Sequence, residues 1–171
     1  MPTLIDRNGR RDDVWVGPDN ATPGDASHLL VTLADWKTGR DRWIGSGRSI
    51  GVLLGPADDP AAIAPDLRAL RLVAVGFPAF TDGRGYSIAR LLRERHGWRG
   101  ELRAVGEVLI DQLHYLARCG FDSFALADGQ PVDAALAAFS ALSDSYQAGV
   151  DRGPLFARRN TIASAETEQS A

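Results

Sequence analysis

Short apolar runs alternate with stretches of helical periodicity from residue 29 onward. Strands are predicted at the short apolar runs, at residues 29–33, 50–54, 72–77, 102–105 and 123–126. Helices are predicted in the gaps, and this alternation is typical of βα units around a parallel sheet. The pattern therefore predicts an α/β fold with a mainly parallel sheet, either an open three-layer sheet or about half of a (β/α)8 barrel.

Helix periodicity and capping residues define four of the predicted helices. They cover residues 61–70, a segment from Ser87 to Gly97, residues 108–118, and Val132 to about Tyr146. Asp59 and Pro60 supply a cap and a first-turn proline for the first of these, and Ser87 is expected to cap the second. Gly120 is the expected C-terminal stop of the third helix, whose predicted buried face carries Leu109, Leu113 and Leu116.

The pattern also divides the chain. Residues 1–28 are polar and rich in turn formers, with one β-like patch at 14–16, and are expected to form an N-terminal arm. Residues 29–157 are expected to form a single α/β domain. Residues 158–171 lack apolar periodicity and are predicted to be a disordered tail.

Composition narrows the class of protein. The chain has 171 residues, with 19 Lys and Arg against 22 Asp and Glu, and 44% of its residues are hydrophobic. These values are those of a globular domain without the excess of basic residues that coats nucleic acid. No N-terminal apolar segment and no long apolar run is present, so we expect a cytoplasmic protein that binds neither membrane nor nucleic acid.

Common cofactor motifs are missing. A single cysteine, Cys119, excludes an intramolecular disulfide and a metal centre built from several cysteines of one chain. No glycine-rich dinucleotide motif follows a strand, and no P-loop or His-rich metal spacing occurs. We therefore expect no metal and no bound cofactor.

The loop after the predicted strand 72–77 is the first candidate site. Ligands of parallel sheets bind beyond the carboxyl ends of the strands, and glycines at a helix start let backbone amides approach an anion. Asp82 is a candidate acid or base. The candidate substrate-binding residues of this loop are Gly83, Arg84, Gly85, Tyr86 and Ser87.

The next strand is followed by two carboxylates. Glu107 and Asp111 are four residues apart, so on a helix they share a face, and both are candidate catalytic residues. Arg103 and Gln112 complete the substrate-binding candidates. Residues 127–130 follow the last predicted strand, so all three loops are expected at one edge of the sheet.

Each candidate also has a structural interpretation. Asp82 can belong to an ordinary strand-to-helix turn, and Glu107 can occupy a first helical turn because the helix dipole favours acids there. Asp111 can pair with Arg103 or Arg118. His114 and Cys119 are most simply packed side chains.

Two long segments resemble a known family. Residues 77–93 (FPAFTDGRGYSIARLLR) and 100–113 (GELRAVGEVLIDQL), followed by 118–122 (RCGFD), are similar to a bacterial family of unknown function. Its members are often named probable oxidoreductases involved in sulfite reduction, because they are encoded beside assimilatory sulfite reductase. The resemblance covers about residues 29–145. Glu107 stands where that family usually has aspartate.

The resemblance implies a role in sulfur assimilation and brings no established catalytic residues. One hypothesis is an accessory protein that binds a small oxyanion, or a partner such as sulfite reductase or another sulfur-assimilation enzyme, at the strand ends. The alternative is an enzyme of the same pathway, an oxidoreductase that uses Asp82, Glu107 or Asp111 with a borrowed cofactor.

Overall fold

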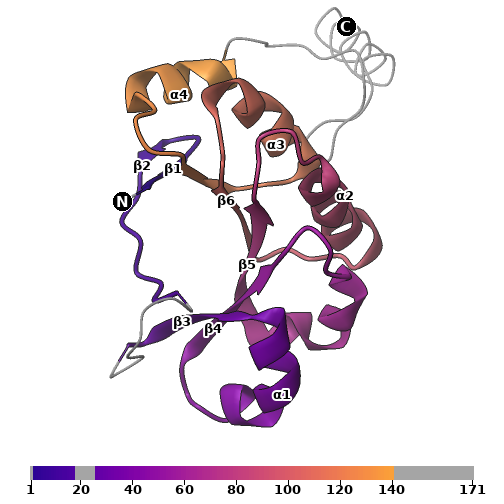
Figure 1. Cartoon of the computed structure of the whole chain (residues 1–171). Coiled ribbons are helices and arrows are strands. Elements are labelled where there is room, and N and C mark those ends of the chain that lie inside the picture. The colour runs from indigo at the N-terminus through magenta and orange to yellow at the C-terminus, as the bar shows by residue number, and fades with distance from the viewer. Residues whose placement is uncertain (1, 18–25, 141–171) are drawn as a thin grey trace, which may run out of the picture.

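The computed structural model describes residues 2–17 and 26–140 and shows an open α/β fold (Figure 1). The predicted tail at 158–171 and the end of the last predicted helix lie outside these residues. In the described part of the chain, no helix is long and apolar enough to cross a membrane.

One seven-stranded sheet organises the molecule. Its strands are β1 (Thr3–Asp6), β2 (Gly9–Arg10), β3 (His28–Thr32), β4 (Ser49–Leu54), β5 (Leu70–Phe77), β6 (Glu101–Gly106) and β7 (Ser123–Leu126). Their order in the sheet is β2-β1-β7-β6-β5-β4-β3. Strands β3 to β7 are parallel and β1 and β2 are antiparallel additions, so the prediction of a mainly parallel sheet is confirmed and the sheet is open rather than a closed barrel.

The parallel strands follow one another in chain order, so every crossover advances in the same direction. Right-handed crossovers then place the connecting helices on one face of the sheet, as Figure 1 shows. These helices are α1 (Leu33–Ile44), the 3-10 helices η1 (Pro60–Ala62) and η2 (Ala64–Ala69), α2 (Arg84–Arg90) with its π-helical extension η3 (Leu91–Arg95), the 3-10 turn η4 (Ile110–Gln112), α3 (Leu113–Cys119) and α4 (Val132–Ser140).

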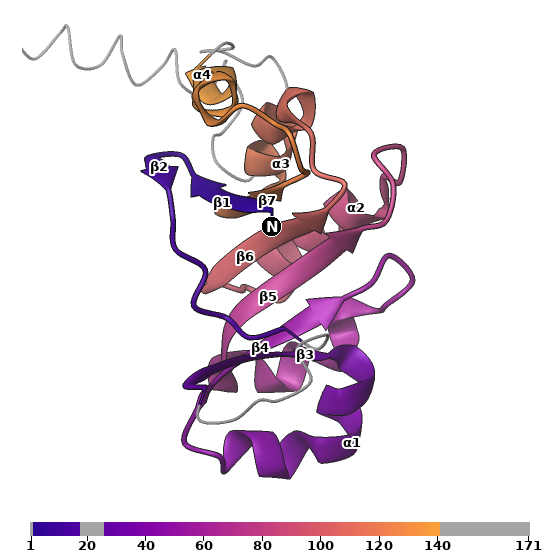
Figure 2. The same ribbon diagram turned by 60° about the vertical axis from the view of Figure 1, so that its left-hand side comes forward.

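The N-terminal segment crosses the opposite face of the sheet (Figure 2). Val16 forms an isolated parallel bridge with Leu29, which accounts for the predicted β-like patch. The ring of Trp15 lies over β4, where a Cβ atom at Gly51 would approach it to 3.1 Å. Strand β1 was not predicted because it is short and lies within a polar region.

Two predicted helices differ in the structure. Residues 61–70 form the two short 3-10 helices η1 and η2, because Pro65 lacks the N–H that an α-helix requires in its interior. The following helix begins at Arg84, so Ser87 lies within it and does not cap it. The cap is replaced by the Asp82 carboxylate, which accepts the Arg84 backbone N–H at 3.1 Å.

The third predicted helix begins later than expected. Leu109 is extended, the chain makes the 3-10 turn η4, and α3 starts only at Leu113. Leu113 and Leu116 are buried as predicted, whereas Leu109 is half-buried. Gly120 ends the helix in the left-handed conformation with a φ of 106°, which confirms it as the stop.

Candidate functional site

The loops that follow β5, β6 and β7 meet at the carboxyl edge of the sheet, as the sequence predicts. The Gln112 side chain joins the first two, since its Nε2 donates to the Phe80 carbonyl at 2.8 Å. The Gln130 side chain joins the last two by accepting the Ile110 N–H at 3.4 Å. We call the exposed part of these loops, which carries Phe80, Arg84, Glu107 and Asp111, the strand-end surface.

Asp82 and Arg84 bind each other at this surface. The Arg84 guanidinium donates from Nε to Oδ1 at 3.0 Å and from Nη2 to Oδ2 at 2.7 Å. The hydrogen bonds from Arg84 lower the pKa of Asp82, and Asp82 in turn raises the pKa of Arg84. Asp82 is therefore a poor proton acceptor, and an anion has to compete with it for Arg84.

The other two candidate carboxylates are exposed. Neither Glu107 nor Asp111 forms a side-chain hydrogen bond or an ion pair within residues 2–17 and 26–140. Asp111 does not pair with Arg103, the alternative considered from the sequence. Both carboxylates are therefore available to a partner or a substrate at the strand-end surface.

Of the four remaining candidates in this loop, Gly85 and Tyr86 pack against neighbouring side chains, whereas Gly83 and Ser87 are exposed. A Cβ atom on Gly85 would lie 2.5 Å from the Phe77 ring, so this glycine is required by helix-to-strand packing. Tyr86 is half-buried with its ring 5.0 Å from that of Tyr115, and burial raises its pKa. Gly83 is the residue before α2, and Ser87 is exposed on that helix.

Arg103 does not join this edge. Its buried guanidinium donates to Asp13 at 2.8 Å and to Glu101 at 2.9 Å, and Glu101 also accepts from the Ser123 hydroxyl at 2.6 Å. The network ties the N-terminal segment to β6 and β7. The structure thus gives Arg103 a role in joining the arm to the sheet.

Two further residues have a structural place. Cys119 is a free, buried cysteine, and burial raises the pKa of its thiol, which disfavours the nucleophilic thiolate. Sequence reasoning missed Phe80, which is 60% exposed on the loop after β5. The signal was an aromatic residue between Pro78 and the Asp-Gly turn. Its exposure could not be read from that pattern.

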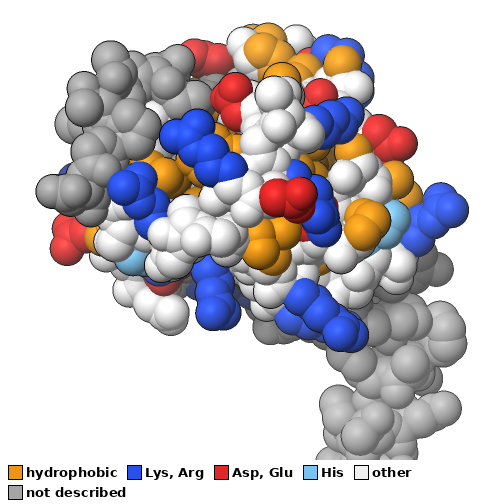
Figure 3. All heavy atoms as spheres, turned by 90° about the horizontal axis from the view of Figure 1, so that it is seen from below, with side chains coloured by type: hydrophobic (Ala, Val, Ile, Leu, Met, Phe, Trp, Pro, Cys, Tyr) orange, Lys and Arg blue, Asp and Glu red, His pale blue; other side chains and the backbone are white. Residues whose placement is uncertain are grey.

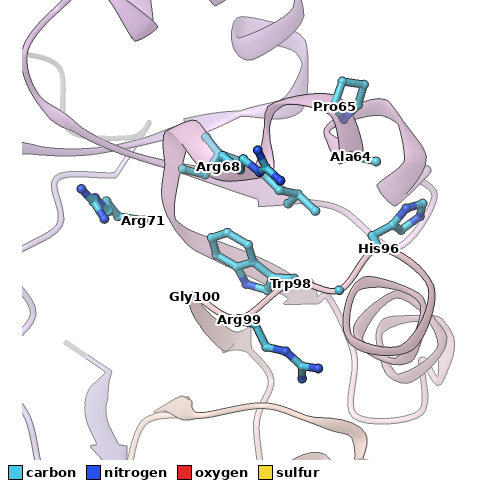
Figure 4. Close-up of a pocket in the computed structure, with 11 residues that line it drawn as sticks. Ala64, Pro65, Arg68, Arg71, His96, Trp98, Arg99 and Gly100 are labelled. Carbon is cyan, nitrogen blue, oxygen red and sulfur yellow. The ribbon is translucent and has the colours of Figure 1, made fainter.

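A cavity of about 580 Å³ opens at the opposite, amino edge of the sheet. It lies between η2, the start of β5 and the loop that precedes β6. Its lining includes Arg68, Arg71, His96, Trp98 and Arg99, and in Figure 4 the side chains of Arg71 and Arg99 extend away from the indole of Trp98. No sequence motif marks this cavity, because its walls come from segments about 30 residues apart.

Arg93 fixes one wall of that cavity. Its buried guanidinium donates to the carbonyls of Trp98 at 2.8 Å, Gly100 at 3.0 Å and Gly120 at 2.9 Å. It also contacts the Asp122 carboxylate at 2.6 Å. Gly100 allows the indole to pack, since a Cβ atom there would lie 2.2 Å from the Trp98 ring.

A second cavity of about 510 Å³ adjoins Arg93 and Arg99 on the β1 side. Its lining includes the acids Asp6 and Asp122. Over the face seen from below in Figure 3, basic side chains occur at several places with acidic ones between them. Such mixing is typical of a protein surface. The cavity beside Trp98 differs from this face because its lining contains basic side chains and no Asp or Glu.

No group of three or more His, Cys, Asp or Glu side chains is arranged to hold a metal ion in the part of the chain that the structure describes.

Comparison with known proteins identifies the family. Residues 51–156, more than half of the chain, match the family model described as "Bacterial protein of unknown function (DUF934)". The chain belongs to this family, and the match includes the three loops that follow β5, β6 and β7 and the cavity at the amino edge. The chain has no significant match among curated proteins.

Proposed function

We propose that this protein is an accessory protein of assimilatory sulfite reduction that binds assimilatory sulfite reductase through its strand-end surface. The pathway comes from the resemblance described above. The mode of action rests on one observation: Phe80 is held exposed on a loop that is bonded to its neighbour.

Gln112 is what holds this loop. Its Oε1 accepts the Leu109 N–H at 3.1 Å while its Nε2 donates to the Phe80 carbonyl. The backbone around Phe80 is therefore fixed while its ring stays in water. Exposed aromatic residues on preorganised backbone are the usual anchors of protein interfaces, because little conformational entropy is lost when they are buried.

Charge supports the same mode of action. Glu107 and Asp111 lie on the loop beside that of Phe80, and neither pairs with another described side chain. Their negative charge would complement a basic patch on sulfite reductase. Charges at the rim of an interface mainly raise the association rate and make it depend on salt. A small oxyanion at the same surface has to displace Asp82 from Arg84, which favours the partner enzyme as the ligand.

The enzyme alternative retains a specific observation in its favour. Glu107 and Asp111 are two exposed carboxylates at the edge where parallel sheets bind ligands. Under this alternative they act as acid and base, and a redox reaction requires a borrowed cofactor. Asp82 contributes less, because Arg84 occupies it and lowers its pKa.

Growth tests the pathway. A deletion strain is expected to need cysteine when sulfate is the sulfur source, because the lost step precedes cysteine synthesis. The wild-type gene is expected to restore growth on sulfate. A deletion strain that grows on sulfate as well as its parent contradicts an essential role in sulfite reduction.

Binding tests the surface. Purified sulfite reductase is immobilised and the protein is titrated over it in an interferometric assay. Phe80→Ala is expected to weaken binding about 30-fold, because truncation of an aromatic anchor costs about 2 kcal/mol. Leu91→Ala is the matched control, since Leu91 is an exposed hydrophobic residue on η3, outside the loops. Equal weakening by both variants, or no binding by the wild type, contradicts the docking surface.

The double variant Glu107→Gln with Asp111→Asn separates the two hypotheses. For an accessory protein, it is expected to slow association at low salt and to support growth in proportion to the binding that remains. For an enzyme, it is expected to bind the partner normally and to fail on sulfate.

A further inference from the structure

We propose that the cavity at the amino edge of the sheet, lined by Arg68, Arg71, His96 and Arg99 and floored by Trp98, binds a small organic phosphate or sulfate ester. This site is separate from the strand-end surface and goes beyond the accessory function proposed above.

The charges of the cavity are the first argument. None of the three arginine side chains forms a hydrogen bond or an ion pair with another residue of the described ranges 2–17 and 26–140, and the same holds for His96. The lining contains no Asp or Glu. A bound oxyanion offers acceptors to guanidinium groups that have no partner of their own in these ranges, and such charge-assisted hydrogen bonds are strong.

The second cavity is an internal comparison. It also contains arginines, among them Arg93 and Arg99, but Asp6 and Asp122 line it too. Asp122 binds Arg93, and Arg11 lies 3.8 Å from Asp6. Two of the four arginines that line the second cavity therefore pair with acids, whereas the lining of the cavity beside Trp98 contains no acid at all.

Size and lining indicate an ester rather than a bare ion. A volume of about 580 Å³ lies within the range of small-molecule sites and far exceeds what one phosphate or sulfate fills. Pro65, Leu67 and Trp98 give the cavity an apolar wall. An oxyanion attached to an apolar or aromatic group satisfies both the guanidinium groups and this wall.

Both walls of the cavity are held in place without a ligand. Arg93 fixes the loop of Trp98 through carbonyl groups, as described above. On the other side, Asp66 in η2 accepts the Arg40 Nε at 2.8 Å, which anchors that helix to α1. The exposed Arg68 side chain is therefore carried on fixed backbone, so binding requires only side-chain movement.

Calorimetric titration with phenyl phosphate and with inorganic phosphate tests the proposal at low ionic strength. The wild type is expected to bind one phenyl phosphate per chain, more tightly than it binds inorganic phosphate. The double variant Arg68→Ala with Arg99→Ala is expected to lose about 100-fold in affinity, about tenfold for each charge-assisted contact removed. Phenyl sulfate is expected to behave as phenyl phosphate does.

Two single variants serve as controls. Arg95→Ala removes an exposed arginine of η3 that does not line the cavity, and Arg84→Ala removes the arginine of the strand-end surface. Both are expected to bind phenyl phosphate as the wild type does. The proposal is overturned if the wild type does not bind the ester, if the ester binds no more tightly than inorganic phosphate, if Arg95→Ala loses as much as the double variant, or if Arg84→Ala abolishes binding.

Discussion

The carboxyl and amino edges of the same sheet differ in how their charged side chains are satisfied. At the carboxyl edge, three aspartates accept backbone N–H groups of the turns in which they lie. Asp58 accepts from Gly55 at 2.7 Å and Asp59 accepts from Ala61 at 2.9 Å. Asp82 does the same for Arg84. These acids are explained by the local chain.

At the amino edge, the basic side chains divide into two groups. Arg93 is buried and fully engaged with carbonyl groups and Asp122. Arg68, Arg71 and Arg99 are exposed around the cavity and have no partner within residues 2–17 and 26–140. Local turn geometry does not account for the second group.

Helix dipoles explain part of this polarity, because helices on one face of a parallel sheet all begin at its carboxyl edge and end at its amino edge. Acids are favoured at the first and bases at the second. The dipole explains which sign collects at each edge, but it does not bring three unpaired arginines to one cavity. The comparison therefore separates the aspartates that serve turns of the fold from two sets of side chains that remain available, namely Glu107 and Asp111 at the carboxyl edge and the cavity arginines at the amino edge.

Of the substitutions that test this comparison, removal of the Arg93 side chain is expected to lower the stability of the protein most. Arg93→Ala removes the side-chain donor to three carbonyl groups and the ion-pair partner of Asp122, and we expect a loss of about 3 kcal/mol in the free energy of unfolding. Arg93→Lys is expected to restore little of this stability, because one ammonium group cannot reproduce the planar set of N–H donors of a guanidinium group.

Urea denaturation followed by circular dichroism measures the loss. Arg95→Ala, an exposed neighbour, is the control and is expected to stay within about 0.5 kcal/mol of the wild type. If Arg93→Ala is as stable as this control, the amino-edge loop does not depend on Arg93.

Removal of the Gln112 side chain tests whether it holds the loops at the carboxyl edge of the sheet in place. Gln112→Ala breaks the bonds to Leu109 and Phe80, and we expect a loss of about 1 to 2 kcal/mol in the free energy of unfolding. Amide hydrogen exchange at Leu109 is expected to accelerate. Asp111→Ala removes an exposed side chain beside it and is expected to change neither quantity. Unchanged exchange in Gln112→Ala would mean that the strand-end surface is not held by this side chain.

The sequence predicted the five parallel strands well because each is centred on a short apolar run that is largely buried in the sheet. Strand 123–126 has the predicted bounds, and the other four begin or end within two residues of them. Helix starts were less well predicted. Pro65 and the extended Leu109 show why: one missing N–H or one extended residue shifts a helix start that periodicity alone places elsewhere.

The candidate site was predicted in part for the same reason. Parallel strands bring their following loops to one edge, so Gln112 and Phe80 had to lie near each other. The Asp82 to Arg84 pair and the burial of Arg103 depend on side-chain direction, which a sequence pattern does not contain. The cavity beside Trp98 joins segments that no local motif connects.

Acid sensitivity of the cavity wall is a smaller expected effect. Arg40 lowers the pKa of Asp66, so the ion pair stabilises the folded state above the ordinary aspartate value, and this contribution is lost as pH falls through the lowered pKa. The difference in unfolding midpoint between the wild type and Arg40→Gln is expected to be constant from neutral pH to about pH 5 and to shrink below roughly pH 4. Asp66→Asn is expected to lack this pH dependence. A difference that grows on acidification contradicts the pair.

The smallest expected effect is on the pKa of Asp82. It tests whether this acid of the carboxyl edge is paired in solution. Its carboxylate binds Arg84, so an NMR titration of the Asp82 carboxyl carbon is expected to give a pKa below the ordinary value of about 3.9. Arg84→Ala is expected to raise that pKa toward the ordinary value, because the first cause of the shift is the side-chain hydrogen bond. Arg90→Ala is the control, since Arg90 pairs with Glu94 on the next helical turns. A wild-type Asp82 that titrates at or above the ordinary value would mean that the pair is open in solution, and Asp82 would then rejoin Glu107 and Asp111 as a candidate base of the enzyme alternative.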